Sequence, residues 1–276
     1  MRAEADAGRP ALRVVRAGWA TSLQDRGRFG HAHLGVGRAG AVDPDAMGRI
    51  GRALGHDPTG PVIETAGGLV LEALRPVIVL ASHWSAPLSL RTGETIAVDP
   101  PAGSNWVTVG VAGGLLVPAL LGSSSADTLG GIVPLAVTEG LVLDVGTDSP
   151  VGPGAADVIV APPRRDTAAV MRGPRVDWFE TEAIDRLLGS EWVVTETSRV
   201  GVRLSGPELG RSRQGELPSE GLVAGAIQVP PDGRPIVMGP DHPVTGGYPV
   251  IAVVVAADLP GVLDRPVGSR IRFVLR

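Results

Sequence analysis

Short runs of apolar residues, separated by glycine and proline, make up most of this chain. Clear examples lie at 76–81, 105–113, 140–146, 156–162 and 249–259, and all are rich in valine. Runs of β-branched residues bounded by turn-forming residues are typical of β-strands. The pattern therefore predicts many short strands joined by turns.

Only two segments carry the pattern of a helix. Asp43 is placed to cap a helix at 44–54, a proline follows it in the first turn, and Gly55 can end the helix. The second helix is predicted from Thr181 to Leu188, with Gly189 as its stop signal. The rest of the chain is predicted to be strand or loop.

Many strands with few helices indicate a mostly β protein built from barrels or sandwiches, in which strand edges are closed or covered. The length of 276 residues exceeds the usual size of one hydrophobic core, which favours two domains. A Pro/Gly-rich stretch at 149–154 and an arginine-containing stretch at 161–175 look like a connection between halves. We therefore predict domains at 10–158 and 159–276.

The composition limits the classes of function. Hydrophobic residues make up 43% and charged residues 20% of the chain, and the formal net charge is −4 without a basic cluster. This argues against nucleic acid as a partner. No run approaches the roughly 18 apolar residues that a membrane span needs, and the N-terminal stretch lacks the apolar centre of a signal peptide. We expect no membrane association and a cytoplasmic location.

Two residue types are missing, and each absence excludes a chemistry. Cysteine does not occur, which excludes disulfides and thiolate nucleophiles on this chain. All 25 basic residues are arginine, so the chain has no Schiff-base lysine, phosphate-loop lysine or biotinyl-lysine. If biotin takes part in the reaction, another chain must carry it.

A first polar and Gly-rich segment spans 21–43 and includes Gln24, Asp25 and Arg28. Its glycines allow a ligand to approach the backbone, and Arg28 is suited to hold a carboxylate or phosphate. A structural alternative is a turn in which Asp25 pairs with Arg26 or Arg28. His31 and His33 would share one face of an extended segment, but two ligands are too few for a metal site, so no metal is predicted.

Two further segments have a binding and a structural interpretation each. A glycine- and serine-rich stretch covers 110–114 and 121–127, where the serines either bind an anion or form an ordinary turn, and the turn is favoured. In an extended chain Arg199 and Arg203 would lie on one face and converge on an anion. The alternative is that they pair with downstream glutamates, among them Glu208, Glu216 and Glu220.

The fourth segment is the richest in chemistry and is the preferred site. It runs from 225 to 233 and from 241 to 249. Asp241 and His242 offer a carboxylate beside an imidazole, and the amides of Gly246 and Gly247 are suited to stabilise an oxyanion. His242 is predicted as the general base or acid and Asp241 as its orienter or as a hydrogen-bond acceptor. If both lie in a regular strand, they point to opposite sides and the pair fails.

Taken in order, the four segments resemble the family of biotin-dependent carboxyltransferases and 5-oxoprolinase C subunits, also called allophanate hydrolase subunit 2, over roughly 12–274. The resemblance implies two cyclophilin-like β-barrel domains. It also implies partners in a hetero-oligomer, namely a B-type chain of cyclophilin-like fold and an A-type chain. From the four segments, the candidate catalytic residues are Asp241, His242, Thr245 and Tyr248, and the candidate substrate-binding residues are Gln24, Asp25, Arg28, Arg199, Arg203, Ser219, Glu220, Gln228, Gly246 and Gly247.

The leading functional interpretation is one component of an ATP-dependent 5-oxoprolinase, a hydrolase that opens the lactam of 5-oxoproline to glutamate. The ATP would be bound by the complex. The alternative is one component of a biotin-dependent carboxyltransferase that acts on urea or a related amide, with biotin supplied in trans. A third interpretation is a non-catalytic regulatory binding protein within the complex, in which the loops bind protein.

The chain departs from the family pattern at two places, and both departures remove positive charge. Relatives tend to have lysine after the Tyr-Pro that follows the double glycine, where this chain has Val250. Relatives often have arginine and threonine in the serine loop, where this chain has Ser124, Ser125 and Ala126 or nearby residues. Roles carried by those side chains elsewhere are not expected here.

Overall fold

The computed structural model describes residues 9–146, 165–213, 215 and 217–276. The chain separates into two compact units that are interleaved in sequence. Unit 1 comprises Met1–Phe29, Ala39–Ala126 and Gly131–Pro162, and unit 2 comprises Gly30–Arg38, Asp127–Gly130 and Pro163–Arg276. The predicted boundary at 158/159 and the strand predicted at 156–162 lie outside the described residues.

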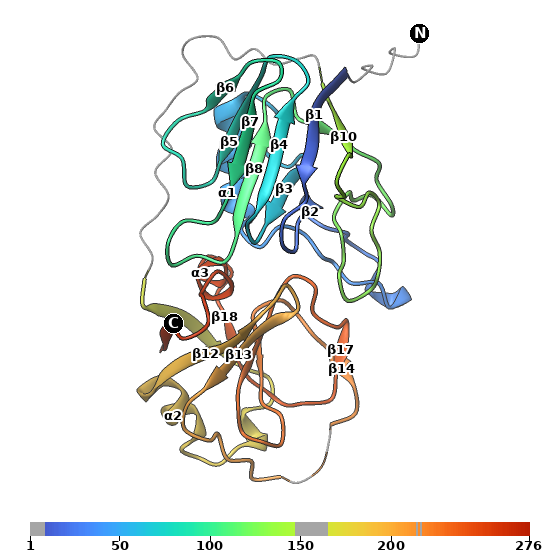
Figure 1. Cartoon of the computed structure of the whole chain (residues 1–276). Helices are drawn as coiled ribbons and strands as arrows, with labels where there is room; N and C mark the ends of the chain where they lie inside the picture. Colours follow the sequence, from blue (N-terminus) through green and yellow to red (C-terminus); the bar gives the residue numbers. More distant parts are fainter. Residues whose placement is uncertain (1–8, 147–164, 214, 216) are drawn as a thin grey trace. The chain divides into compact units, whose positions relative to one another are not determined.

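Unit 1 consists of two antiparallel five-stranded sheets and one helix (Figure 1). The first sheet has the order β7 (Thr95–Val98), β4 (Leu69–Ala73), β1 (Arg9–Arg16), β10 (Val142–Val145) and β9 (Leu115–Leu116). The second has the order β2 (Ser22–Gln24), β3 (Val62–Thr65), β8 (Val107–Val111), β5 (Val77–Ala81) and β6 (Leu88–Leu90).

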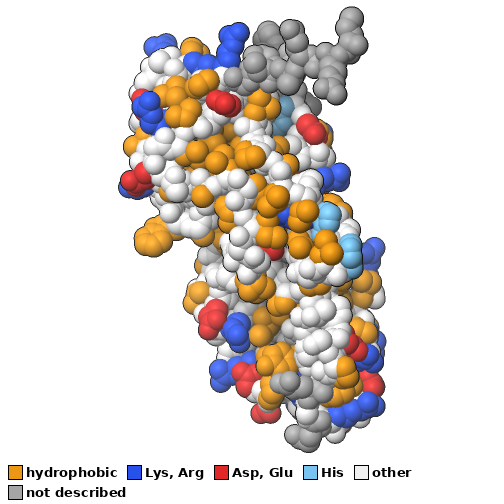
Figure 2. All heavy atoms as spheres, turned by 90° about the vertical axis from the view of Figure 1, so that its right-hand side faces the viewer, with side chains coloured by type: hydrophobic (Ala, Val, Ile, Leu, Met, Phe, Trp, Pro, Cys, Tyr) orange, Lys and Arg blue, Asp and Glu red, His pale blue; other side chains and the backbone are white. Residues whose placement is uncertain are grey.

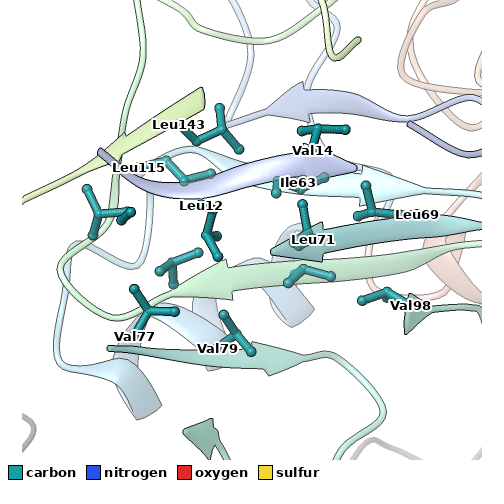
Figure 3. Packing of buried hydrophobic residues seen from close by; sticks show 14 of the residues in the cluster. Leu12, Val14, Ile63, Leu69, Leu71, Val77, Val79, Val98, Leu115 and Leu143 are labelled. Atoms are coloured by element: carbon teal, nitrogen blue, oxygen red, sulfur yellow. The ribbon is translucent and has the colours of Figure 1, made fainter. Parts of the chain in front are cut away.

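The core of unit 1 follows from the alternation along its strands. On β1, Leu12 and Val14 are fully buried, while Arg13 points outward and pairs with Glu72 at 2.9 Å. Figure 3 shows Leu12 and Val14 among buried side chains from both sheets, including Leu71 and Val79. Because the period of a strand is two residues, every second position contributes to this one core.

The helix α1 (Pro44–Leu54) covers the second sheet of unit 1. It confirms the helix expected at 44–54, since the Asp43 carboxylate accepts a hydrogen bond from the Ala46 amide at 2.8 Å and Gly55 adopts φ +70°. A Cβ at Gly110 of β8 would lie 2.3 Å from the side chain of Ile50. This close approach explains why β8, with α1 behind it, is buried at every position.

The described residues of unit 2 form a closed seven-stranded barrel, four short helical elements and a small two-stranded ladder. Around the barrel the strands are β11 (Thr167–Arg172), β18 (Val250–Val254), β15 (Ala226–Gln228), β16 (Ile236–Met238), β13 (Gly201–Ser205), β12 (Glu191–Thr197) and β19 (Arg270–Leu275). The remaining elements are β14 (Glu220–Gly221) paired with β17 (Thr245–Gly246), η2 (Val176–Trp178), α2 (Ala183–Gly189) and α3 (Leu259–Leu263). One more turn, η1 (Ala32–Leu34), precedes α1 in sequence but belongs to unit 2.

Large side chains fill the barrel of unit 2. Trp192 and Phe273 are completely buried, and the Trp192 indole N–H donates to the Leu187 carbonyl of α2 at 2.9 Å. A buried indole needs such a partner. This hydrogen bond therefore attaches α2 to the strand that follows it.

The mostly β class is confirmed, with barrel closure found in unit 2. Among the described residues of unit 1 the strands form two five-stranded sheets, which enclose the core without closing into one barrel. The second helix begins at Ala183, two residues later than predicted, and includes Gly189. The assignment of 249–259 to strand is wrong at its end, because α3 starts at Leu259. In the part of the chain that the structure describes, no helix is long and apolar enough to cross a membrane.

Candidate functional site

Asp25 organises the polar cluster of unit 1. It follows β2 and accepts hydrogen bonds from the hydroxyls of Ser123 and Ser125, both at 2.6 Å. The backbone amides of Ser124 and Gly27 donate to the same carboxylate at 2.7 and 2.8 Å. The serine loop thus supplies donors to Asp25, which favours the structural interpretation of both segments.

The environment of Asp25 shifts its acidity in two opposing directions. Burial alone would raise the pKa of the carboxyl, but the hydrogen bonds from Ser123, Ser125, Ser124 and Gly27 together lower the pKa below its ordinary value of 3.8. Asp25 therefore stays ionised at neutral pH and stabilises the folded loop as an anion.

Replacing Asp25 with asparagine is expected to lower the free energy of unfolding by about 2 kcal/mol at pH 7, because an amide cannot accept all of these bonds. Since the folded pKa is depressed, this contribution is fully present above the unfolded pKa of about 3.9 and is lost as the pH falls through the folded value. Urea unfolding from pH 7 to pH 2 should show the difference from wild type shrinking in acid. Asp144→Asn, at a partly exposed position of β10, is the control and should change little; an equal loss there would contradict the assignment.

The neighbours of Asp25 are also engaged inside unit 1. Gln24 is fully buried, and its side-chain amide donates to the Ala126 carbonyl at 3.1 Å and to the Ser22 hydroxyl at 2.8 Å. Arg28 is 2% exposed and donates to the backbone carbonyls of Leu120 and Ser125. The expectation that Arg28 presents a bidentate clamp to a ligand is therefore wrong in this structure, since its guanidinium holds the serine loop.

In unit 2, a buried ion pair joins two of the predicted site residues. Arg199 donates from Nε and Nη2 to the two carboxylate oxygens of Asp241, both at 3.0 Å, and the side chains are 2% and 0% exposed. The amide and hydroxyl of Thr128 add donors at 2.9 and 2.7 Å. The Asp241 carboxylate is thus a hydrogen-bond acceptor for Arg199 and Thr128, and among the described residues it makes no direct hydrogen bond to the His242 ring.

His242 is oriented by its own chain instead. Its Nδ1 lies 2.7 Å from the Pro243 carbonyl oxygen. A carbonyl only accepts, so Nδ1 carries the hydrogen, and in the neutral ring Nε2 is left with a lone pair. Among the described residues no partner of Nε2 is found. The half-buried imidazole is therefore set up as a proton acceptor.

Arg199 and Arg203 do not converge on one anion, contrary to the extended-chain prediction. Residues 198–201 form a turn closed by the Ser198 amide and the Gly201 carbonyl at 3.0 Å, so the backbone between the two arginines is not extended. Arg203 lies on the outer face of β13 and pairs with Glu196 at 3.1 Å, with both side chains largely exposed. The surface salt-bridge alternative therefore holds for Arg203, with a partner that had not been predicted.

The structure brings most of the fourth segment together with parts of the third. The short ladder between β14 and β17 places Glu220 opposite Gly246. Gln228 donates from Nε2 to the Tyr248 carbonyl at 3.1 Å, and the Arg211 guanidinium lies 5.8 Å from the centre of the Tyr248 ring. Glu220, Gln228, Thr245, Gly246, Gly247 and Tyr248 thus form one cluster, which we call the glutamine cluster; Ser219 lies exposed at its side.

Two arginines that the sequence did not single out support the glutamine cluster. Arg175 donates from Nε to Glu220 at 2.9 Å and from Nη2 to its other oxygen, and this bonding lowers the pKa of Glu220. Arg211 donates to the Val229 carbonyl next to Gln228. Glu220 is therefore a structural partner of Arg175 and is less available to a substrate than predicted.

The double glycine lies in close packing. A Cβ at Gly246 would lie 2.7 Å from Nε2 of Gln228 and 2.8 Å from Leu222, and a Cβ at Gly247 would lie 3.2 Å from the Leu217 carbonyl. The Gly247 carbonyl accepts from the Leu217 amide at 3.0 Å, while no acceptor of the Gly247 amide lies among the described residues. This amide remains a candidate donor to an oxyanion.

Three further side chains singled out in the sequence, those of His31, His33 and Val250, do not contribute to either cluster. His31 and His33 flank and occupy the turn η1, so they are not on an extended segment, and the described residues contain no group of three or more possible metal ligands. Val250, where relatives tend to have lysine, packs in an apolar cluster with Ala226 and Met238. On the face drawn in Figure 2, basic and acidic side chains are interspersed.

Comparisons with known proteins identify relatives over nearly the whole chain. The C subunit of 5-oxoprolinase from Escherichia coli is 32% identical over 95% of this chain and 90% of that protein. The protein of the same name from Haemophilus influenzae is 28% identical over 91% of this chain and 87% of that protein. The urea amidolyase of Saccharomyces cerevisiae is 27% identical over 96% of this chain but only 16% of that protein.

Solved structures agree with the fold. The crystal structure of TTHA0988 is 31% identical, with a TM-score of 0.87 over 98% of this chain, and the present chain spans 56% of that one. The urea amidolyase of K. lactis also gives a TM-score of 0.87 at 25% identity, covering 98% of this chain and 19% of that chain. The family model described as carboxyltransferase domain, subdomain A and B, matches residues 34–275. The chain therefore belongs to the carboxyltransferase subdomain A and B family.

Proposed function

We propose that this chain is the C-type component of a multi-protein 5-oxoprolinase, which opens the lactam of 5-oxoproline to glutamate at the expense of ATP. The observation that carries the proposal is the similarity to the C subunit of E. coli 5-oxoprolinase, which extends over 95% of this chain and 90% of that protein. Agreement over most of both chains favours a component of the same kind. The A-type and B-type partners belong to this proposal.

In this proposal His242 acts as the general base. Water adds to the lactam carbonyl carbon while its proton passes to Nε2 of His242, and the same proton then passes to the lactam nitrogen as the C–N bond breaks. The amide of Gly247, two residues beyond Thr245 in the same segment, is the donor we assign to the developing oxyanion. Thr245 is exposed and offers a hydroxyl to the substrate.

The buried Arg199–Asp241 pair has a positioning role in this proposal. The Asp241 amide donates to the Arg199 carbonyl at 3.0 Å, in addition to the ion pair between their side chains. Both bonds fix the backbone directly before His242. Their function is therefore to hold the imidazole in place, while the proton transfer belongs to His242.

The described residues Arg28, Arg199 and Arg175 do not provide free cations for the phosphates of a nucleoside triphosphate. Arg28 donates to carbonyls, Arg199 to Asp241, and Arg175 to Glu220, so these three guanidinium groups serve protein acceptors. The sequence also has no lysine for a phosphate. We therefore assign ATP binding to a partner chain.

A second candidate is carboxyl transfer to urea, favoured by the similarity to urea amidolyases over 96% of this chain. Biotin would then have to arrive on another chain, since this one has no lysine to carry it. The short share of those proteins that is matched makes this the weaker candidate. Regulatory protein binding without catalysis is the third, and no described contact favours it.

The proposal is tested by coexpressing the chain with the A-type and B-type products of neighbouring genes. We expect 5-oxoproline-dependent ATP hydrolysis and glutamate release from the purified complex, and loss of both when this chain is omitted. The control omits 5-oxoproline. A complex that assembles but shows no lactam-dependent turnover would overturn the proposal, and a biotinylated carrier with urea would be assayed next.

A further inference from the structure

Gln228 is a deeply buried carboxamide at an irregular point of the barrel. Its side chain is 4% exposed, and the pairing of β15 with β18 shifts register between Ile227 and Gln228. Such bulges re-aim a side chain relative to a regular strand and are frequent next to binding sites. The position of Gln228 thus combines burial with a local break in the ladder.

The hydrogen-bond partner of the Gln228 side chain shows which of its two terminal atoms is Nε2 and which is Oε1. Nε2 lies 3.1 Å from the Tyr248 carbonyl oxygen, and a carbonyl can only accept, so the nitrogen must be on that side. Gly246 packs so closely that a Cβ there would lie 2.7 Å from the same nitrogen. The amide is therefore held from two directions, and its other end is Oε1, which can only accept.

The structure shows no donor to Oε1 among the described residues. Oε1 of Gln228 is not among the described polar atoms that are both fully buried and unpaired, so it is reachable by solvent and can accept a bond from a ligand or water. The missing partner must be an N–H or O–H donor. A lactam has one N–H in its ring, and this group distinguishes it from the corresponding lactone.

Unit 1 contains a related arrangement. Gln24 is fully buried at the end of β2, and its Nε2 donates to the Ala126 carbonyl at 3.1 Å, as Gln228 does to Tyr248. Oε1 of Gln24 is buried and has no hydrogen-bond partner among the described residues. Among the described residues, each unit thus holds a glutamine anchored through its nitrogen, but Oε1 of Gln24 is fully buried whereas Oε1 of Gln228 is not.

We infer that Gln228 is a specificity-determining residue that reads the ring N–H of the substrate through Oε1. The assignment rests on the proposed function, because that proposal supplies a substrate with an amide N–H. The Tyr248 carbonyl and Gly246 act as positioning groups for the carboxamide. Substrates in which oxygen replaces this nitrogen are discriminated against by the loss of one hydrogen bond.

The experiment compares the lactam with its lactone analogue in the assembled complex. KM for 5-oxoproline and the inhibition constant of 5-oxotetrahydrofuran-2-carboxylate, which lacks the N–H, are measured for wild type and Gln228→Met. We expect wild type to prefer the lactam by about tenfold, as one hydrogen bond allows. In Gln228→Met the preference for the lactam over the lactone should fall to about twofold or less, mainly because KM for the lactam rises.

A second pair of variants leaves the glutamine itself in place. Gly246→Ala places a carbon against Nε2 of Gln228 and should also reduce the preference for the lactam. The control is Gly221→Ala in the partner strand β14. Its added carbon has nothing within 4 Å, so the preference should stay as in wild type. If both Gln228→Met and Gly246→Ala turn over 5-oxoproline and keep the wild-type preference for the lactam over the lactone, the role of Gln228 is overturned. The proposed function is not affected by that result. A wild-type complex without lactam-dependent turnover overturns the proposed function, and this assignment with it.

Discussion

Replacing Arg199 with methionine is expected to lower the free energy of unfolding by about 3–5 kcal/mol, because it leaves the Asp241 carboxylate buried without its countercharge. Both side chains are almost completely buried, and Thr128 alone cannot neutralise the anion. Urea unfolding monitored by circular dichroism measures the loss. The matched control is Arg203→Met, which removes an exposed ion pair four residues away and should cost less than about 1 kcal/mol.

A double variant separates the two contributions to this loss. Arg199→Met combined with Asp241→Leu removes both charges and should recover most of the stability, since an apolar pair of similar volume often replaces a buried ion pair without cost. Part of the loss should remain, because the Thr128 hydroxyl and amide lose their acceptor. A single variant as stable as Arg203→Met, or a double variant less stable than the single one, would contradict this view.

Local signals were sufficient for the elements whose ends are fixed by their own neighbours. The helix α1 begins and ends where its capping residues place it, because the Asp43–Ala46 bond and the left-handed Gly55 are formed within a few residues. The helix α3 has only five residues, including a proline and a glycine, so no apolar periodicity distinguishes it from the preceding strand.

The sequence identified the segments of the site but not their partners. Asp25 and the serine loop were both singled out, yet the hydrogen bonds between them join positions about 100 residues apart. Thr128 reaches Asp241 across 113 positions and carries no motif of its own. Such pairings depend on how the strands assemble, which spacing along the chain does not encode.

The same limit explains the errors about the arginines. Spacing of four residues places Arg199 and Arg203 on one face only if the backbone is extended, and the turn at 198–201 removes that condition. The expected contact between Asp241 and His242 is missing for a similar reason. The Asp241 carboxylate bonds to Arg199, while the His242 ring bonds to the Pro243 carbonyl. In each case the sequence shows which side chain is present, but bonds to distant residues or to the backbone set its orientation.

Replacing His242 with asparagine is expected to reduce kcat of the assembled complex about 10²–10⁴-fold, the usual contribution of general acid–base catalysis. Asparagine can keep a donor close to the Pro243 carbonyl and so preserve the loop, but it has no basic nitrogen in place of Nε2. KM for 5-oxoproline should change little, because the lost interaction belongs to proton transfer.

The control for this variant is His33→Asn, which changes an exposed imidazole of the same unit and should leave kcat within about twofold, as expected for a surface position. Assembly with the partner chains is measured by size-exclusion chromatography for both variants, so that loss of turnover is separated from loss of the complex. If His242→Asn forms the complex and retains more than about one tenth of wild-type kcat, proton transfer by His242 is excluded. The base must then come from a partner chain, and the segment around Thr245 and Gly247 would bind the substrate without carrying its proton.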